Sequence, residues 1–278
     1  MGKIFKLEDI AYNLAYETNL VLLDGSVVDK QTAEMEAEKD NYYYGYLGKT
    51  ALSSSSVKEL YKSPKAYYNS INRVQRDSAA LREGRLAHTL ILEPELVEEK
   101  YEILDLSSRT TKLFKEKSDS SNKEVVLLKE YNSMMNLKRS INNSKEVSEL
   151  FTGGLAEVPI VDQIAGLPFR AKADYIRGKN VNEIVDLKTT SDLSNWEWTA
   201  KNKWHYDIQA YVYCKLFKAS KFTFVVIEKS SGEILVAETS TEFIESGMFK
   251  VNKSIERYIK YFINEEEDPK QYIRKTTL

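Results

Sequence analysis

The chain has 278 residues, 42% of them hydrophobic and 29% charged, which is enough to bury the core of one large globular domain. Its 40 basic side chains are balanced by 42 acidic ones, so any DNA-binding charge must be local. The single cysteine, Cys214, excludes a disulfide framework and a four-cysteine metal cluster. With no secretory signal and no apolar run of ~18 residues, we expect a soluble cytoplasmic protein without a membrane partner.

The first third of the chain predicts short helices after an irregular start. Residues 1–50 show no clean period and end in the tyrosine-rich sequence NYYYGYLG, which is typical of a loop or an irregular arm. Ser56 and Glu59 have the spacing of a capping box, and Pro64 suits the first turn of a second helix. Apolar residues then recur at helical spacing over 78–92, which predicts a helix with one buried face.

The pattern changes in the middle of the chain. Residues 107–123 are polar and predict a mobile segment, after which helices are expected from Lys123 and from Ser144. Three β-prone runs separated by turns then predict consecutive antiparallel strands over 156–164, 168–176 and 182–190. The rest predicts a helix, two strands and a long helix over 206–217, 222–228, 233–238 and 241–263. The predicted fold class is α/β (α+β), with the order α-β-β-β-α-β after an N-terminal helical region.

Two carboxylates and a lysine lie at neighbouring positions of the predicted sheet. Asp186 and Lys188 are two residues apart on one strand, so their side chains share a face. Asp174, near the end of the preceding strand, is expected beside Asp186. Two such carboxylates repel by about 4 kcal/mol at about 4 Å and an effective dielectric near 20, which favours a bound cation. The pattern predicts a site for magnesium, with manganese as the alternative, and gives Lys188 a role toward the attacking water. By itself the spacing also fits solvated side chains at strand ends.

The helix that follows carries a polar and aromatic face. Gln209 and Tyr213 are four residues apart in the sequence QAYVY and therefore share that face. An ordinary packed helix gives the same pattern. The sequence D…DLK followed by QxxxY nevertheless resembles the RecB-like branch of the PD-(D/E)XK nuclease superfamily. That branch adds a histidine from an upstream helix, and GRLAHTLILEPE, with His88, looks like this motif and like the RecE-type (exonuclease VIII) phage and prophage exonucleases.

The resemblance spans roughly residues 50–240 and implies a restriction-endonuclease-like core, with an α-βββ-α-β mixed sheet flanked by helices. It divides the chain into an N-terminal arm over 1–50, a nuclease domain over 51–264 and a C-terminal tail over 265–278. It implies a catalytic set of Asp174, Asp186 and Lys188, and metal ligands His88, Asp174, Asp186 and the carbonyl of Leu187. Gln209 and Tyr213 would be supporting or DNA-contacting residues.

Several further residues are weaker candidates. Glu157 stands where some relatives carry an extra acid, but a solvated strand residue is at least as plausible a reading. Ser53 and Ser55 lie in a serine-rich helix start that suits a terminal phosphate, although a plain helix cap explains the same residues. Arg82 and Arg85 precede His88 and are candidate phosphate contacts, or else part of a solvated helix face.

The resemblance implies an exonuclease that degrades one strand of linear double-stranded DNA from its ends, 5′→3′, and leaves single-stranded tails for recombination or repair. Its partners would be DNA ends, a single-strand annealing protein or recombinase, and further copies of itself in a ring-shaped homo-oligomer, in a bacterial cell and encoded by a phage or prophage. The alternatives are an endonuclease or repair nuclease of the same superfamily, and a catalytically silent DNA-end-binding scaffold.

Overall fold

A computed structural model describes residues 19–73, 77–178 and 181–275. Its centre is a five-stranded sheet in the order β5-β6-β7-β8-β9, in which every neighbouring pair is antiparallel except β7–β8. The strands are β5 (Leu155–Ile164), β6 (Leu167–Arg177), β7 (Glu183–Thr190), β8 (Lys221–Glu228) and β9 (Ile234–Glu238). The predicted fold class and the order of its core elements are confirmed.

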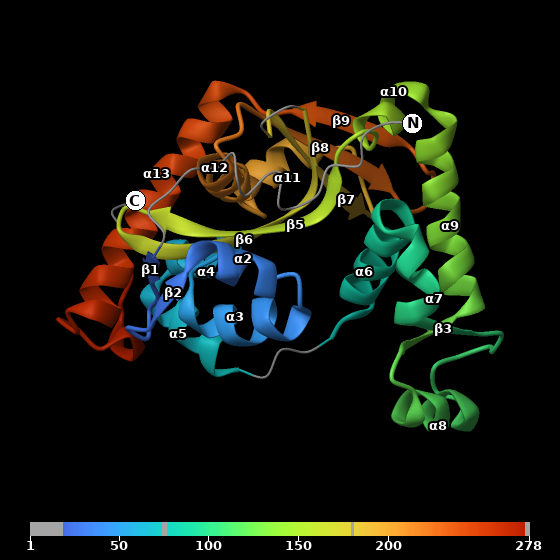
Figure 1. The fold of residues 1–278 in the computed structure, drawn as a ribbon, viewed down its shortest axis with the longest axis horizontal. Helices are drawn as coiled ribbons and strands as arrows, with labels where there is room; N and C mark the ends of the chain where they lie inside the picture. The colour runs from blue at the N-terminus through green and yellow to red at the C-terminus, as the bar shows by residue number, and fades with distance from the viewer. Residues whose placement is uncertain (1–18, 74–76, 179–180, 276–278) are drawn as a thin grey trace.

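Helices cover both faces of this sheet (Figure 1). One face packs against α4 (Ser54–Lys62), α12 (Tyr206–Phe217) and α13 (Thr241–Tyr258), and the other against α6 (Ala79–Leu92), α9 (Leu128–Asn143) and α10 (Lys145–Leu150). β8 is apolar along most of its length because it is buried on both sides, as expected of a central strand between two helical layers. None of the helices in the described ranges is long and apolar enough to cross a membrane.

The N-terminal segment is described from Asn19 onward. It forms β1 (Asn19–Val21), β2 (Val27–Asp29), α2 (Lys30–Glu36), the π-helical turn η1 (Asn41–Tyr46) and α3 (Leu47–Thr50). A small core that includes Leu20, Tyr43 and Leu47 packs against Val161 of β5, so these residues dock on the sheet. The irregular arm expected over residues 1–50 is therefore structured where it is described, and its residues 1–18 lie outside the described ranges.

Between the N-terminal segment and the sheet, several boundaries differ from those predicted. α4 is capped by Ser53, whose hydroxyl accepts from the Ser56 backbone N–H, so the cap lies three residues before the expected cap, Ser56. Helix α8 (Lys112–Ser120) occupies part of the segment expected to be mobile, and strand β4 (Glu124–Leu127) stands where a helix was expected from Lys123. The elements between α4 and β5 that have not yet been given are α5 (Pro64–Asn72), η2 (Pro94–Leu96), α7 (Val97–Lys100) and β3 (Tyr101–Leu104).

The C-terminal half follows the prediction more closely. α12 has the predicted bounds, while the long helix expected over 241–263 is α13 followed by a π-helical turn, η3 (Ile259–Ile263). α11 (Trp196–Asn202) and α12 lie between β7 and β8 in the chain and form the crossover that makes this pair parallel. A short 3₁₀ turn, η4 (Pro269–Gln271), follows.

Candidate metal centre and active site

Three carboxylates line up across the sheet. In the β5–β6 register, Ala156 pairs with Tyr175 and Val158 with Ala173, which leaves Glu157 opposite Asp174. The β6–β7 ladder stops at the pair Tyr175–Val185, one residue before Asp174 and Asp186. The strands separate there, and the Leu187 backbone N–H donates to Asp174 Oδ2 at 2.8 Å instead of to a backbone carbonyl. The register thus places Glu157 opposite Asp174, with Asp186 on the neighbouring strand just beyond the end of the ladder.

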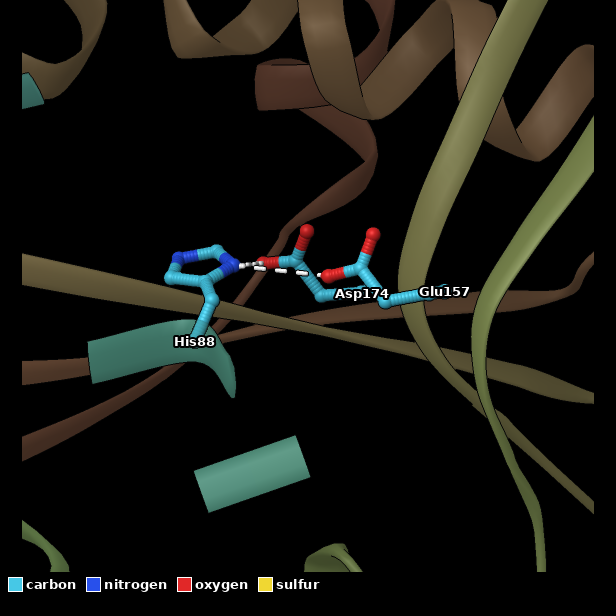
Figure 2. A group of neighbouring side chains, drawn as sticks. All are labelled: His88, Glu157 and Asp174. Carbon is cyan, nitrogen blue, oxygen red and sulfur yellow. Dashed lines mark ion pairs between the residues drawn. The ribbon is translucent and has the colours of Figure 1, made fainter. Parts of the chain in front are cut away.

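His88 joins two of these acids from α6 (Figure 2). Its Nδ1 lies 3.7 Å from Glu157 Oε1 and 3.7 Å from Asp174 Oδ2. Among the described residues, His88, Glu157 and Asp174 are the group of potential metal ligands whose ligand atoms all lie within 4.8 Å of one another. Glu157 has a left-handed backbone, with a φ of 50°, and such strain in a non-glycine residue is common at functional sites.

The hydrogen bond on the far side of the ring fixes the tautomer of His88. Nε2 lies 3.0 Å from the carbonyl oxygen of Leu187, and a carbonyl only accepts, so Nε2 carries the hydrogen. In the neutral ring the lone pair is then on Nδ1, which faces the carboxylates. The Leu187 carbonyl, predicted as a ligand, here orients the histidine in the way that carbonyls commonly orient metal-binding histidines.

Asp186 stands beside this group rather than within it. Its side chain is fully buried, its Oδ1 accepts from the Gln209 side-chain amide at 2.5 Å, and its Oδ2 forms an ion pair with Lys188. Apart from this ion pair with Lys188, the buried Oδ2 has no hydrogen-bond partner in the described ranges. An oxygen of this kind next to three converging ligands fits a divalent cation. The donor set, carboxylate oxygens with one imidazole, is of the kind that binds divalent cations.

The charges of this cluster are strongly coupled. Burial raises the pKa of Asp186 to about 6, against the opposing effect of the Lys188 ammonium. Burial also raises the pKa of Asp174. For His88, burial alone would lower the pKa, but Asp174 and Glu157 outweigh it and raise the pKa to about 9. Burial alone would also lower the pKa of Lys188, but the negative charges of Asp186 and Asp174 have the larger effect and raise it. The Lys188 side chain is therefore a cation.

The remaining predicted residues take different positions. Gln209 is a supporting residue through its bond to Asp186, and Tyr213 is 8% exposed and packs against Phe222, which does not suit a DNA contact. Arg82 and Arg85 both bind the carboxylate of Asp77. Arg85 also pairs with Glu124, so its charge is already neutralised by two acids. Their contact with DNA stays a prediction.

A pocket of about 330 Å³ lies between α4 and the start of α12. Ser55 is exposed and lines it, whereas the hydroxyl of Ser53 caps α4. Lys58 Nζ lies 4.7 Å from the ring centre of Tyr206, and Lys188 Nζ lies 5.3 Å from the same ring. Through this shared ring the pocket adjoins the site. The pocket residues are Ser55, Lys58, Glu59, Lys62, Lys203, Trp204, His205 and Tyr206.

Sequence reasoning missed Lys58 and Tyr206 and placed Glu157 only among the weaker candidates. Glu157 was rated below the other acids because its proximity to Asp174 depends on strand register, which local sequence does not encode. Lys58 could have been found, since it lies one helical turn after Ser55 and shares its face. Nothing in the sequence marks Tyr206 as a site residue, apart from its place in a stretch rich in aromatic residues. The structure brings together the predicted His88, Asp174, Asp186 and Lys188.

The sheet with its flanking helices and the carboxylate–lysine site together define the PD-(D/E)XK class of nuclease folds. Residues 53–276 match the family model described as "PDDEXK-like domain of unknown function (DUF3799)", and the chain belongs to this family. The predicted membership of the superfamily is thereby confirmed. That the chain belongs to the RecE-type exonucleases within this superfamily stays a prediction.

Two solved structures align with the chain, and the first of them is similar to it in fold. A crystal structure named "putative exonuclease", from Eubacterium rectale, aligns with a TM-score of 0.62 and 17% identity over 86% of this chain and 95% of that one. A phage-related exonuclease from Haemophilus somnus aligns with a TM-score of 0.32 and 14% identity over 78% and 96% of the two chains. No curated protein matches the sequence significantly.

Proposed function

We propose that the protein is a metal-dependent exodeoxyribonuclease that hydrolyses phosphodiester bonds at the ends of linear double-stranded DNA. One observation carries this proposal: His88, Glu157 and Asp174 converge next to the buried Asp186–Lys188 pair. A scaffold that only binds DNA ends has no use for a buried ion pair, which costs desolvation energy, beside three converging metal ligands. The carboxylate-rich site supports magnesium, with manganese as the alternative.

The side chains of the site have distinct tasks in this proposal. A bound divalent cation would stabilise the negative charge that develops on the phosphate and lower the pKa of water. Lys188 remains an ammonium, so it orients the attacking water or a phosphate oxygen instead of removing a proton. Gln209 holds Asp186 in place through its amide, leaving Oδ2 to face Lys188.

The pocket beside Lys188 supports action at strand ends. Its volume of about 330 Å³ is at the small end of the range for ligand sites. Ser55 offers a hydroxyl, Lys62 and Lys203 offer ammonium groups, and Lys58 offers an amine whose pKa burial lowers to about 7. Such a set suits a terminal phosphate better than a continuous duplex. The 5′→3′ direction, and the delivery of single-stranded tails to an annealing protein or recombinase, are proposed from the resemblance to RecE-type exonucleases.

The proposal is tested by digesting end-labelled linear duplex and closed circular DNA with magnesium, manganese or EDTA. The wild type should degrade linear DNA only, and only with a metal. Asp186→Ala and Lys188→Ala should each lower kcat by about 10²–10³-fold, the usual loss when a preorganised charged group is removed from a reaction centre. Lys221→Ala is the matched control, because this lysine lies in the same sheet and pairs with Glu183 and Glu238 outside the site.

Each other outcome selects an alternative. Cutting of circular DNA would replace the exonuclease with an endonuclease or repair nuclease. Binding of DNA ends without any metal-dependent cleavage would leave a silent scaffold. Equal activity of the wild type and Lys188→Ala would remove this lysine from the mechanism.

A further inference from the structure

Tyr44 lies close to the metal ligands although it comes from outside the matched family domain. It belongs to η1, before the matched residues 53–276. Its ring centre is 5.9 Å from Lys172 Nζ, and Lys172 Nζ is 4.0 Å from Glu157 Oε2. The other oxygen of Glu157 faces His88 Nδ1 at 3.7 Å. Two side-chain contacts therefore connect this ring to the candidate metal centre.

Tyr43 and Tyr44, which are adjacent in η1, have different environments. Tyr43 is 5% exposed, and the Arg170 guanidinium lies 4.4 Å from its ring centre, so this tyrosine packs the segment onto the sheet. Tyr44 is 61% exposed and stands at 89° to the ring of Tyr43. The fold therefore does not need the ring of Tyr44 for its core. Single-turn π-helical distortions such as η1 are frequent at functional sites.

The surroundings of Tyr44 suit a nucleotide. Arg170 and Lys172 each place a cationic group 5.9 Å from its ring centre, and cations beside an aromatic surface are the features with which proteins bind single strands. Desolvation of the hydroxyl and the charges of Glu157 and Asp40 raise the pKa of Tyr44 to about 12, so the phenol adds no negative charge at neutral pH. One exposed ring is too small to serve as an apolar protein-docking patch.

We propose that Tyr44 stacks on a nucleobase adjoining the scissile phosphate and thereby positions the DNA strand in the site. This inference rests on the proposed nuclease function. It makes the segment before the family domain part of the substrate-binding surface. The stacking is indifferent to sequence, because every base has an aromatic face.

The test combines protein variants with substrates that lack a base. Linear duplexes carry an abasic residue at the terminal or at the next position of each strand, and kcat/KM is measured for each. For the wild type, removing the stacked base should lower kcat/KM by about 5- to 150-fold, the range for losing one stacked base. Tyr44→Ala should show that loss on intact DNA and no further loss on the abasic substrate. Tyr44→Phe and Tyr44→Trp should stay within about threefold of the wild type, since stacking needs only the ring.

A binding measurement keeps the inference testable if no cleavage occurs. DNA with 2-aminopurine at the same positions is bound in the presence of calcium, and its fluorescence should be quenched by the wild type and Tyr44→Phe but not by Tyr44→Ala. Phe249→Ala is the control, because Phe249 on α13 is 62% exposed and lies outside the site. If Tyr44→Phe loses as much as Tyr44→Ala, the hydroxyl acts and stacking is refuted. Equal quenching by all variants refutes it too, whereas absence of any DNA-end binding would overturn the nuclease proposal itself.

Discussion

At His88, one hydrogen bond decides which ring nitrogen faces the carboxylates. The Leu187 carbonyl holds the hydrogen on Nε2, and the charges of Asp174 and Glu157 raise the pKa to about 9. Without metal, the ring is therefore protonated on both nitrogens near neutral pH. A cation that binds Nδ1 must displace a proton, so the two compete for the same lone pair.

This competition predicts how metal affinity depends on pH. Because the pKa of His88 is raised, the proton is bound below about pH 9 and lost above it. The affinity for manganese should rise about tenfold per pH unit from neutral pH and level off near pH 9. Calorimetry in buffers of different ionisation enthalpy should show about one proton released at pH 7.5. In His88→Asn this proton should be missing, and an unchanged release would exclude His88 as a ligand.

At the scale of elements, the contact between α12 and α13 depends on one glycine. A Cβ at Gly247 would lie 2.0 Å from the Asp207 carbonyl oxygen and 2.9 Å from Tyr211 Cβ. Backbone atoms cannot yield as a flexible side chain would, so the two helices would have to separate. Because α12 also carries Gln209, this separation would disturb the support of Asp186.

Gly247→Ala should therefore lower the free energy of unfolding by on the order of 2–3 kcal/mol. Gly84 on α6 is the matched control, because nothing lies within 4 Å of a Cβ placed there. Gly84→Ala should stabilise the protein by about 0.5–1 kcal/mol through helix propensity. Urea unfolding measures both. Similar effects of the two substitutions would mean that the helices can shift apart at little cost.

Elements with a clear period could be predicted from the sequence, and short apolar runs could not. α12 could be predicted with its bounds because, at 12 residues, it is too long for a buried strand. The run EVVL in β4 is four residues long, and such a run fits a helix as well as a strand until its partner β3 is known. For the site, Asp186 and Lys188 follow from strand alternation. Glu157 and Tyr44 reach it only through tertiary packing, which spacing along the chain does not encode.

At the scale of the whole molecule, the N-terminal segment is held on the sheet by a polar contact as well as by its small core. Lys30 on α2 pairs with Asp162 of β5 at 2.6 Å. Glu34, one turn further along, lies partly buried beside the same strand. Burial raises its pKa to about 7, against a hydrogen bond from the Val161 backbone. Ionisation of the Glu34 carboxyl therefore weakens the packing of the N-terminal segment against the sheet.

The raised pKa of Glu34 predicts how the stability of the folded protein changes with pH. A carboxyl with a raised pKa contributes stability that is fully present below its unfolded value and is lost as the pH rises through about 7. Glu34→Gln keeps the hydrogen-bond acceptor without the charge. It should change stability little at pH 5 and increase it by on the order of 1–3 kcal/mol at pH 8. Thermal unfolding at the two pH values measures this, and equal effects at both would show that Glu34 is solvated.

The parallel pairing of β7 with β8 has a consequence for how the molecule folds. β7 carries Asp186 and Lys188, and its partner joins only after the crossover of residues 191–220 has been made. Closing such a connection costs chain entropy before any pairing is gained, so this step is slow compared with the β5–β6 hairpin. His88 must also reach this strand from a distant part of the sequence. We therefore expect the charged centre to assemble late in folding, after the local hairpin and the helices of the crossover have formed.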